Sequence, residues 1–269
     1  MSLDIPAALE DGFMRLPTRV AGLLFVAYLI IGIVSTVAAQ TLSVAVMETI
    51  QQSMAAGGNA PPPSAVAGAG VGAGAGANTL ALDVGVPVAA VLFVVQVIVA
   101  QVVGVIAIRT FVSDARRSFP SGVTRHLPWV ILNALVASFI TTLLIGIGTI
   151  LLVIPGIYLA VALYFVQFEV IVEEENAIDA LRTGWALTKG ARLSVFLLLL
   201  VIFAIGLASA VPSIALGFAG APPLVATLVS LFVGAVASIV SVAIGARAYV
   251  QLKPDGWSSD IGTPDPFDY

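Results

Sequence analysis

The feature that most constrains this chain is a series of six apolar segments, each about as long as a membrane-crossing helix. The hydrocarbon core of a bilayer is about 30 Å thick, so one helical crossing needs roughly 20 apolar residues. The sequence therefore predicts an all-α integral membrane protein in which six transmembrane helices form a bundle. We place them in a single transmembrane domain over residues 1–253. The six segments lie at about residues 20–46, 84–108, 129–154, 157–172, 193–218 and 224–246.

Some of these segments admit another interpretation. The fourth is the shortest, and it reaches full length only if Pro155 and Gly156 begin it and Glu169 lies near the interface. An alternative with five helices therefore makes the third and fourth segments re-entrant. In a second alternative the first segment is a cleaved signal peptide, and Val37-Ala38-Ala39 weakly resembles a cleavage site. Its apolar run is longer than that of most signal peptides.

The composition supports a membrane environment and excludes several kinds of site. Hydrophobic residues make up 59% of the 269 residues and charged residues 10%, whereas soluble domains carry about 25% charged residues. A water-soluble domain of this size cannot bury so much apolar surface in one core. Because the chain has no cysteine, disulfides, thiolate catalysis and cysteine metal sites are excluded. The net charge of -4 gives no reason to expect a nucleic-acid partner.

The basic residues predict the orientation of the helices. Arginine and lysine near helix ends stay on the cytoplasmic side of a membrane. With the N-terminus inside and six crossings, all of them fall in cytoplasmic segments, whereas one missed or extra helix would place some outside. We therefore expect a multi-pass protein of the cell membrane with both termini in the cytoplasm. The basic residues are Arg15, Arg19, Arg109, Arg116, Arg117, Arg125, Arg182, Lys189, Arg192, Arg247 and Lys253.

Two further segments differ in composition from the helices. Residues 55–78 are rich in Gly, Ala and Pro and carry no charge, which predicts a flexible extracytoplasmic loop. Their spaced glycines do not predict a phosphate-binding loop, because no GK[ST] motif follows them and no strand–helix context surrounds them. Residues 254–269 are polar and acidic, and we expect them to form a disordered cytoplasmic tail.

Two pairs of similar stretches indicate an internal repeat. Residues Ala8–Phe13 match Ala180–Trp185 at an offset of 172 residues, and each stretch precedes an apolar segment. The second apolar segment of each copy ends similarly, at Arg109–Val112 and Arg247–Val250. We interpret this as a parallel repeat of an interfacial helix, a span, an outside loop and a span, with a hairpin between the copies. Chance similarity in so biased a sequence is the alternative.

Several short motifs resemble those of a known family. They are Ile154-Pro155-Gly156-Ile157-Tyr158, Glu173-Glu174, Ala180-Leu181 and Thr188-Lys189-Gly190. They resemble a family of multi-pass prokaryotic membrane proteins of unknown function, common in haloarchaea and related to the membrane domain of some glycerophosphodiester phosphodiesterases. The resemblance is clearest over Thr149–Leu200 and implies a fold more than a function. No soluble phosphodiesterase domain accompanies it here, so that activity is not expected.

The sequence offers little catalytic chemistry. The single histidine, His126, lies in a predicted cytoplasmic loop, where we expect a solvated side chain. None of the HExxH, GxSxG or paired intramembrane Asp motifs is present. A zinc site without a second histidine would need an unusual set of ligands. We therefore predict no enzyme, no cofactor and no metal site.

Polar residues inside predicted spans are the remaining candidates for a functional site. Glu169 is the best of them, and Gln167 and Gln101 are its possible companions in an intramembrane polar site. Hydrogen bonding between helices explains uncharged groups of this kind without any ligand. Glu169 also lies one turn before Glu173, so it could simply reach interfacial water.

Two amphipathic stretches, near residues 4–16 and 174–189, predict interfacial helices on the cytoplasmic side. They either pack on the rim of the bundle or form a docking surface that includes Phe13 and Trp185. The leading hypothesis is a non-enzymatic membrane scaffold or partner-docking component, with the lipid bilayer and a membrane protein as partners. The alternative is a small permease or lipid-handling transporter. A buried, water-lined cavity joining Gln101, Gln167 and Glu169 would favour the alternative.

Overall fold

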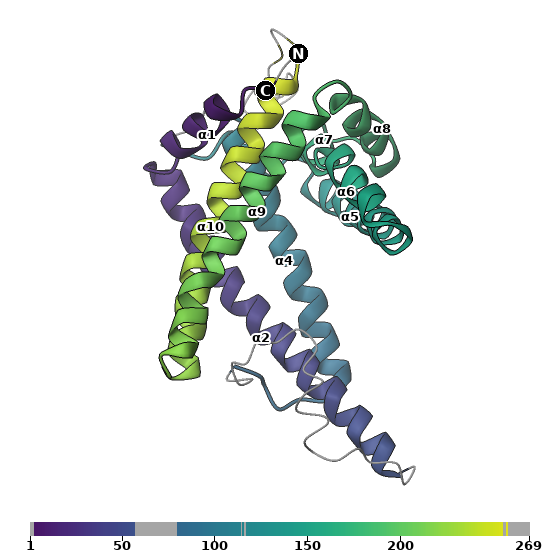
Figure 1. Ribbon diagram of the computed structural model, residues 1–269, viewed down its shortest axis with the longest axis vertical. Helices are drawn as coiled ribbons and strands as arrows, with labels where there is room; N and C mark the ends of the chain where they lie inside the picture. The colour runs from purple at the N-terminus through teal and green to yellow at the C-terminus, as the bar shows by residue number, and fades with distance from the viewer. Residues whose placement is uncertain (1–2, 57–79, 114, 116, 255–256, 258–269) are drawn as a thin grey trace, which may run out of the picture. The chain divides into compact units, whose positions relative to one another are not determined.

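The computed structural model describes residues 3–56, 80–113, 115, 117–254 and 257, and every regular element in these residues is a helix. Most of the loop predicted at 55–78 and most of the tail predicted at 254–269 lie outside the described residues. The helices of Figure 1 are α1 (Ile5–Met14), α2 (Arg19–Ala56), α4 (Val86–Val112), α5 (Leu127–Leu151), α6 (Val153–Ala162), α7 (Val166–Val172), α8 (Ala177–Leu187), α9 (Arg192–Phe218) and α10 (Pro223–Leu252).

Six helical segments of the described residues are long and apolar enough to cross a membrane. They are α2, α4, α5, α9, α10 and the segment Val153–Val172, which contains α6 and α7. The prediction of an all-α membrane protein with six such helices is therefore confirmed. The fourth segment begins at Val153, four residues before the predicted start at residue 157, because a single extended residue, Leu152, makes the turn from α5 into α6.

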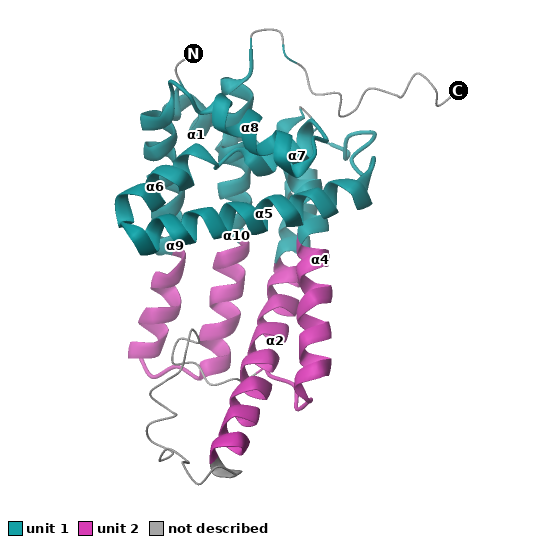
Figure 2. Ribbon diagram, turned by 90° about the vertical axis from the view of Figure 1, so that its right-hand side faces the viewer, with its two compact units in different colours: residues 1–28, 101–208, 236–269 teal, residues 29–100, 209–235 magenta. Residues whose placement is uncertain are grey.

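The chain divides into two compact units, shown in different colours in Figure 2, and the long helices α2, α4, α9 and α10 contribute to both. Unit 2 comprises residues 29–100 and 209–235. Inside it, the Ser35 hydroxyl donates a hydrogen bond of 2.7 Å to the Gln96 side chain, which joins α2 to α4. The residues leading into α4 bind α2 as well, since the backbone N–H of Leu82 donates to Thr41 Oγ1. Polar groups of these two spans therefore hold the helices to each other.

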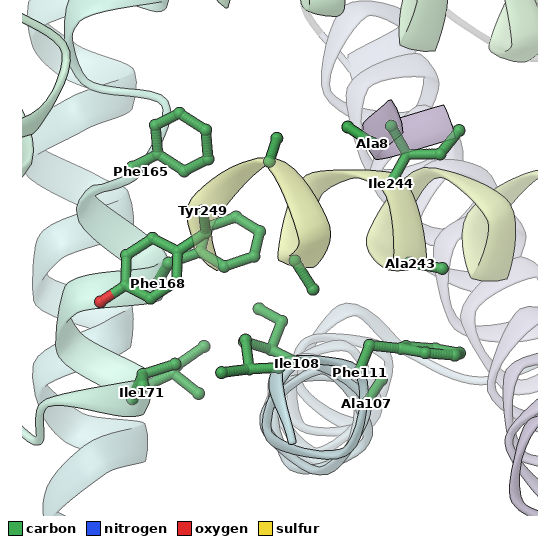
Figure 3. Close-up of a cluster of buried hydrophobic side chains, with 14 of the residues drawn as sticks. Ala8, Ala107, Ile108, Phe111, Phe165, Phe168, Ile171, Ala243, Ile244 and Tyr249 are labelled. Atoms are coloured by element: carbon green, nitrogen blue, oxygen red, sulfur yellow. The ribbon is translucent and has the colours of Figure 1, made fainter. Parts of the chain in front are cut away.

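Unit 1 comprises residues 1–28, 101–208 and 236–269, and it contains the apolar core shown in Figure 3. Side chains from α1, α4, α7 and α10 meet there. Tyr249 of α10 is fully buried, and its ring stacks on Phe168 with centroids 5.4 Å apart. This packing explains why α10 continues past residue 246, where the predicted span ends.

The two short helices α1 and α8 pack through small residues at matching positions of the predicted repeat. Gly12 of α1 lies so close to α10 that an added Cβ would be 3.0 Å from Ile244 Cγ1 and 3.2 Å from its backbone nitrogen. Gly184 of α8 meets α7 in the same way, 3.0 Å from the backbone nitrogen of Val166. Ala8 and Ala180, one turn earlier, are completely buried. In each copy, therefore, an alanine and a glycine one turn apart form a helix face of small residues that packs closely against a neighbouring helix, α10 for α1 and α7 for α8.

Both short helices begin directly after a residue whose side chain caps the helix N-terminus. Asp4 accepts a hydrogen bond from the backbone N–H of Ala7 at the start of α1. Asn176 accepts from the backbone N–H groups of Ile178 and Asp179, so α8 begins at Ala177. The predicted start at residue 174 was early because Glu174 has a left-handed backbone, with φ 57°, which ends α7 and separates it from α8.

Within unit 1, α5 runs across the direction of the α9 and α10 segments rather than alongside them (Figure 2). The helices α6 and α7 return along α5 and form a hairpin with it. Two glycines allow the closest approach at the turn, since an added Cβ on Gly156 would be 2.8 Å from the Thr149 backbone. Gly148 lies 3.2 Å from Gly156 by the same measure. Only a residue without a side chain fits at this position of α6.

The glycine contacts of α1 and α8 lead to a test by alanine substitution. Gly12→Ala and Gly184→Ala should each destabilise the protein by about 1–3 kcal/mol, because the new methyl group has no room. Gly146→Ala in α5 is the matched control, since its added Cβ meets nothing within 4 Å. Thermal unfolding in one detergent measures all three variants. Equal midpoints for the three would contradict the close packing of α1 and α8.

Candidate functional site

The three polar residues predicted to form an intramembrane site do not gather around one cavity. Glu169 and Gln167 both lie on α7. They are two positions apart, however, and an α-helix turns by roughly 200° over two residues, so their side chains point in nearly opposite directions. The Gln167 amide accordingly points to α5, where it donates to the Ala134 carbonyl at 3.0 Å and to the Ser138 hydroxyl. Gln101 lies on α4 and, like Gln167, does not line the cavity that contains Glu169.

Glu169 instead forms a buried ion pair with Lys253, which directly follows α10. Its side chain is 2% exposed, and its two oxygens lie 2.9 and 3.1 Å from Lys253 Nζ. The same ammonium group lies 2.9 Å from Glu173 Oε1. The Tyr249 hydroxyl is within hydrogen-bonding distance of both carboxylates, at 3.2 and 3.3 Å. The two carboxylates therefore share one positive charge, that of Lys253, and both lie within hydrogen-bonding distance of one tyrosine hydroxyl.

The spacing of these four residues explains why they meet. Glu173 directly follows α7, four residues after Glu169, and Lys253 directly follows α10, four residues after Tyr249. Each pair therefore lies on one side of its helix. Trp257 closes the cluster by donating its indole N–H to Glu173 at 3.0 Å. The ammonium group of Lys253 also lies over the rings of Tyr249 and Trp257, at 4.9 and 5.5 Å from their centroids.

A cavity of about 590 Å³ opens beside this cluster. We call it the charged cavity. Its charged lining consists of three carboxylates and two ammonium groups, together with the indole of Trp257. Glu175 is held by the Thr183 hydroxyl, which donates to it at 2.6 Å, whereas Lys189 is exposed to solvent. The charged lining residues are Glu169, Glu173, Glu175, Lys189 and Lys253.

A second charged cluster surrounds Glu174 and is built into the fold. The guanidinium group of Arg109, at the end of α4, is completely buried. It donates to the carbonyls of Ile171, Val123 and Arg125 at 2.9, 3.1 and 2.8 Å, and to the Glu174 carboxylate at 2.9 Å. A planar guanidinium has five donors, which suits contacts in several directions. Arg109 thereby joins three segments: the end of α4, the loop before α5 and the end of α7.

Glu174 also binds two side chains from the loop before α5. Arg125 Nε lies 3.2 Å and His126 Nδ1 2.6 Å from its oxygens. Burial of the carboxylate raises its pKa, but the hydrogen bonds from His126 and Arg125 and the positive charges of Arg125 and Arg109 outweigh this effect, so the pKa is below its usual range. The lone histidine, predicted to be a solvated loop residue, is exposed but bound to this carboxylate.

The two residues predicted to form an interfacial docking surface differ in their surroundings. Phe13 is exposed on α1. Trp185 is half-buried on α8, where its ring packs edge-on against Tyr158 with centroids 5.8 Å apart. The guanidinium carbon of Arg192 lies near both rings, 4.7 Å from the centroid of Trp185 and 4.8 Å from that of Tyr158. Trp185 therefore takes part in the packing of α6, α8 and α9.

Sequence reasoning missed two residues that bind Glu169, namely Tyr249 and Lys253. It treated Lys253 as a topology marker after the last span and left Tyr249 inside the repeat motif. The signal that could have found them is the pairing of two i, i+4 motifs with complementary groups, one acidic and one basic. Among the described residues, no group of three or more His, Cys, Asp or Glu side chains is arranged to hold a metal ion.

Arg109→Lys tests how far the fold depends on this guanidinium. Lysine keeps the charge but cannot reach carbonyls in several directions, so buried acceptors lose their partners. We expect the free energy of unfolding to fall by roughly 3 kcal/mol. Arg182→Lys is the matched control, because Arg182 is exposed on α8. Unfolding in denaturant measures both; a loss no larger in Arg109→Lys than in the control would show that the guanidinium is dispensable.

The lowered pKa of Glu174 predicts a pH dependence of stability. A carboxylate whose folded-state pKa lies below its ordinary value of 4.5 stabilises the fold above that pH, and the contribution is lost as the pH falls through the folded-state pKa. The wild type should therefore exceed Glu174→Gln in stability by a constant margin at neutral pH, and the margin should shrink in acid. Thermal unfolding over a pH series measures it, with Glu10→Gln on the exposed side of α1 as control. A margin that grows in acid would contradict the prediction.

Comparison with known proteins places the chain in a family but gives it no activity. The family model described as "Domain of unknown function (DUF7847)" matches residues 3–252, so the chain belongs to that family. No curated protein matches the sequence. No solved structure matches it either.

Proposed function

We propose that this member of the DUF7847 family is a non-enzymatic membrane protein that acts as a scaffold and docks a partner at the charged cavity. The observation that carries the proposal is the placement of its polar groups. The amide side chains of Gln96, Asn133 and Gln167 within the spans bind neighbouring helices, whereas open charged groups collect in the cavity at the ends of α7 and α10. In the orientation predicted from the basic residues, this cavity faces the cytoplasm of a protein in the cell membrane.

The polar groups of the spans support a packing role. Asn133 of α5 donates to the Trp129 carbonyl at 3.0 Å and accepts from the backbone N–H of Ala177 at 3.1 Å, which fixes the start of α8. Gln96 and Gln167 likewise bind neighbouring helices. Groups used in this way hold helices together. They do not form the continuous polar path that a transported solute would need.

The charged cavity has the features of a surface that recognises a partner. It combines carboxylates, ammonium groups and an indole, which together suit the polar side chains of a protein segment. Glu173 and Lys189 keep part of their surface open to solvent. The core of the cluster, Glu169 with Lys253, is buried and fixed, so it gives the cavity a rigid floor.

A small permease or lipid-handling transporter is the second candidate. Burial of Glu169 within an apolar segment favours it, because ionisable groups in such segments often bind or relay ions. In that case Glu169→Gln should remove a ligand-dependent thermal stabilisation that the wild type shows. The docking proposal expects no such stabilisation and no loss of partner capture in a folded Glu169→Gln variant.

Charge reversal at the rim of the charged cavity tests the docking proposal. Lys189→Glu alters this rim in the turn after α8, whereas Arg182→Glu reverses an exposed charge on α8 away from the cavity. We expect several-fold lower recovery of crosslinked membrane-protein partners for Lys189→Glu only, measured by quantitative mass spectrometry after crosslinking in the native membrane. Equal melting temperatures would confirm that both variants fold. Equal recovery from both variants and the wild type would rule out docking at this cavity.

A further inference from the structure

We propose that the hairpin formed by α5, α6 and α7 lies within one leaflet of the membrane, with its tip among lipid acyl chains, and does not cross to the other side. The tip is the turn at residues 148–156. Four of the six apolar helices, α2, α4, α9 and α10, then make the crossings. This inference concerns the lipid partner of the hairpin and stands apart from the docking proposal.

The contact between Tyr158 and Arg192 carries the inference. Arg192 is the first residue of α9, which has 27 residues and is therefore about 40 Å long. Its side chain donates to the Tyr158 hydroxyl, and its guanidinium lies over the Tyr158 ring. Tyr158 in turn is only about 9 Å of helix from Leu152 at the tip. The tip therefore stays close to the level at which α9 begins.

A crossing hairpin would contradict this geometry. The hydrocarbon core is about 30 Å thick, so α9 must carry Arg192 and Phe218 to opposite sides of it. If Leu152 reached the side of Phe218, Tyr158 would lie near that side as well, far from Arg192. The direction of α5 agrees, because α5 runs across α9 and α10 within unit 1 (Figure 2). A helix that crosses membrane-spanning helices at a large angle lies along the plane of the membrane.

The surface of the tip fits lipid rather than water. Five consecutive apolar side chains, those of residues 150–154, are between 62% and 87% exposed. At a turn that reached the aqueous phase they would all face water, which the hydrophobic effect opposes. The partner that covers them is the acyl-chain region of the same membrane that surrounds the neighbouring spans.

The backbone of the turn is suited to a place without water. The N–H of Leu152 donates to the Gly148 carbonyl at 3.0 Å, and the N–H of Gly156 donates to the Leu152 carbonyl at 3.4 Å. The Thr149 hydroxyl donates to the Ile145 carbonyl at 2.8 Å, and Pro155 has no N–H to satisfy. Polar groups in hydrocarbon must find partners inside the protein, and these groups do.

The base of the hairpin has the opposite character. His126 and Arg125 precede α5, and they bind Glu174 just after α7. Trp129, in the first turn of α5, is exposed, as expected for an indole at the membrane–water interface. The hairpin thus has a charged base at the aqueous surface and an apolar tip among acyl chains. Base and tip lie in the same half of the membrane.

The absence of cysteine from the natural chain makes a direct test possible. Three single-cysteine variants, Leu152→Cys, Ala219→Cys and Ser121→Cys, are treated with a membrane-impermeant maleimide on intact cells and on inverted membrane vesicles. We expect Ala219→Cys to react from one side only and Ser121→Cys from the other. Leu152→Cys should react from neither side, and should react fully once the protein is denatured in detergent.

Two outcomes would overturn the inference. Reaction of Leu152→Cys from the same side as Ala219→Cys would mean that the hairpin crosses, and reaction from the Ser121→Cys side would mean that its tip lies in water. A second measurement uses a fluorescent bimane label on the same variants in phosphatidylcholine–phosphatidylglycerol vesicles that contain nitroxide-labelled acyl chains. Quenching should be several-fold stronger for L152C than for S121C; equal quenching would also reject the proposal. Neither result bears on partner capture at the charged cavity.

Discussion

The buried guanidinium of Arg109 is the contact on which the arrangement of unit 1 depends. It donates to the carbonyl of Arg125, just before α5, to the carbonyl of Ile171, near the end of α7, and to the carboxylate of Glu174. The beginning and the end of the α5–α7 hairpin are therefore both fixed to the end of α4. Since Glu169 lies on α7 and Glu173 directly follows this helix, the positions of both carboxylates also depend on Arg109. The approach of α8 is set there too, because Glu174 ends α7 and Asn176 begins the next helix. A charge deep in the fold is tolerated because its donors find acceptors in several directions.

The two charged clusters divide structural and functional roles between neighbouring carboxylates. Glu174 is held by cations from α4 and from the loop before α5, and it joins segments. Glu169 and Glu173 share a lysine and a tyrosine from the end of α10, next to a cavity that stays open. The six residues from Glu169 to Glu174 therefore contain one carboxylate that holds segments of the fold together and two that line a candidate binding surface. These carboxylates differ in role because the fold gives them different partners.

The sequence predicted the parts of this protein that depend on local patterns. Apolar length predicted the six helices, and two amphipathic stretches predicted α1 and α8, although the predicted start of α8 at residue 174 preceded its N-cap, Asn176. It could not predict contacts between distant residues: Lys253 reaches Glu169 across 84 positions of sequence. The predicted grouping of Gln101, Gln167 and Glu169 relied on their location within predicted spans and took no account of the direction of each side chain around its helix. Helix length alone also could not show which way α5 runs, because the same apolar composition suits a helix that crosses a membrane and one that lies within it.

The hairpin held at its base by Arg109 has a mechanical consequence for the bilayer around it. A body that displaces acyl chains in one leaflet increases the area of that leaflet and leaves the other unchanged. A bilayer relieves such a mismatch by bending, so that the expanded leaflet takes the convex side. A membrane crowded with this protein would therefore acquire spontaneous curvature, and a membrane already curved in that sense would attract it.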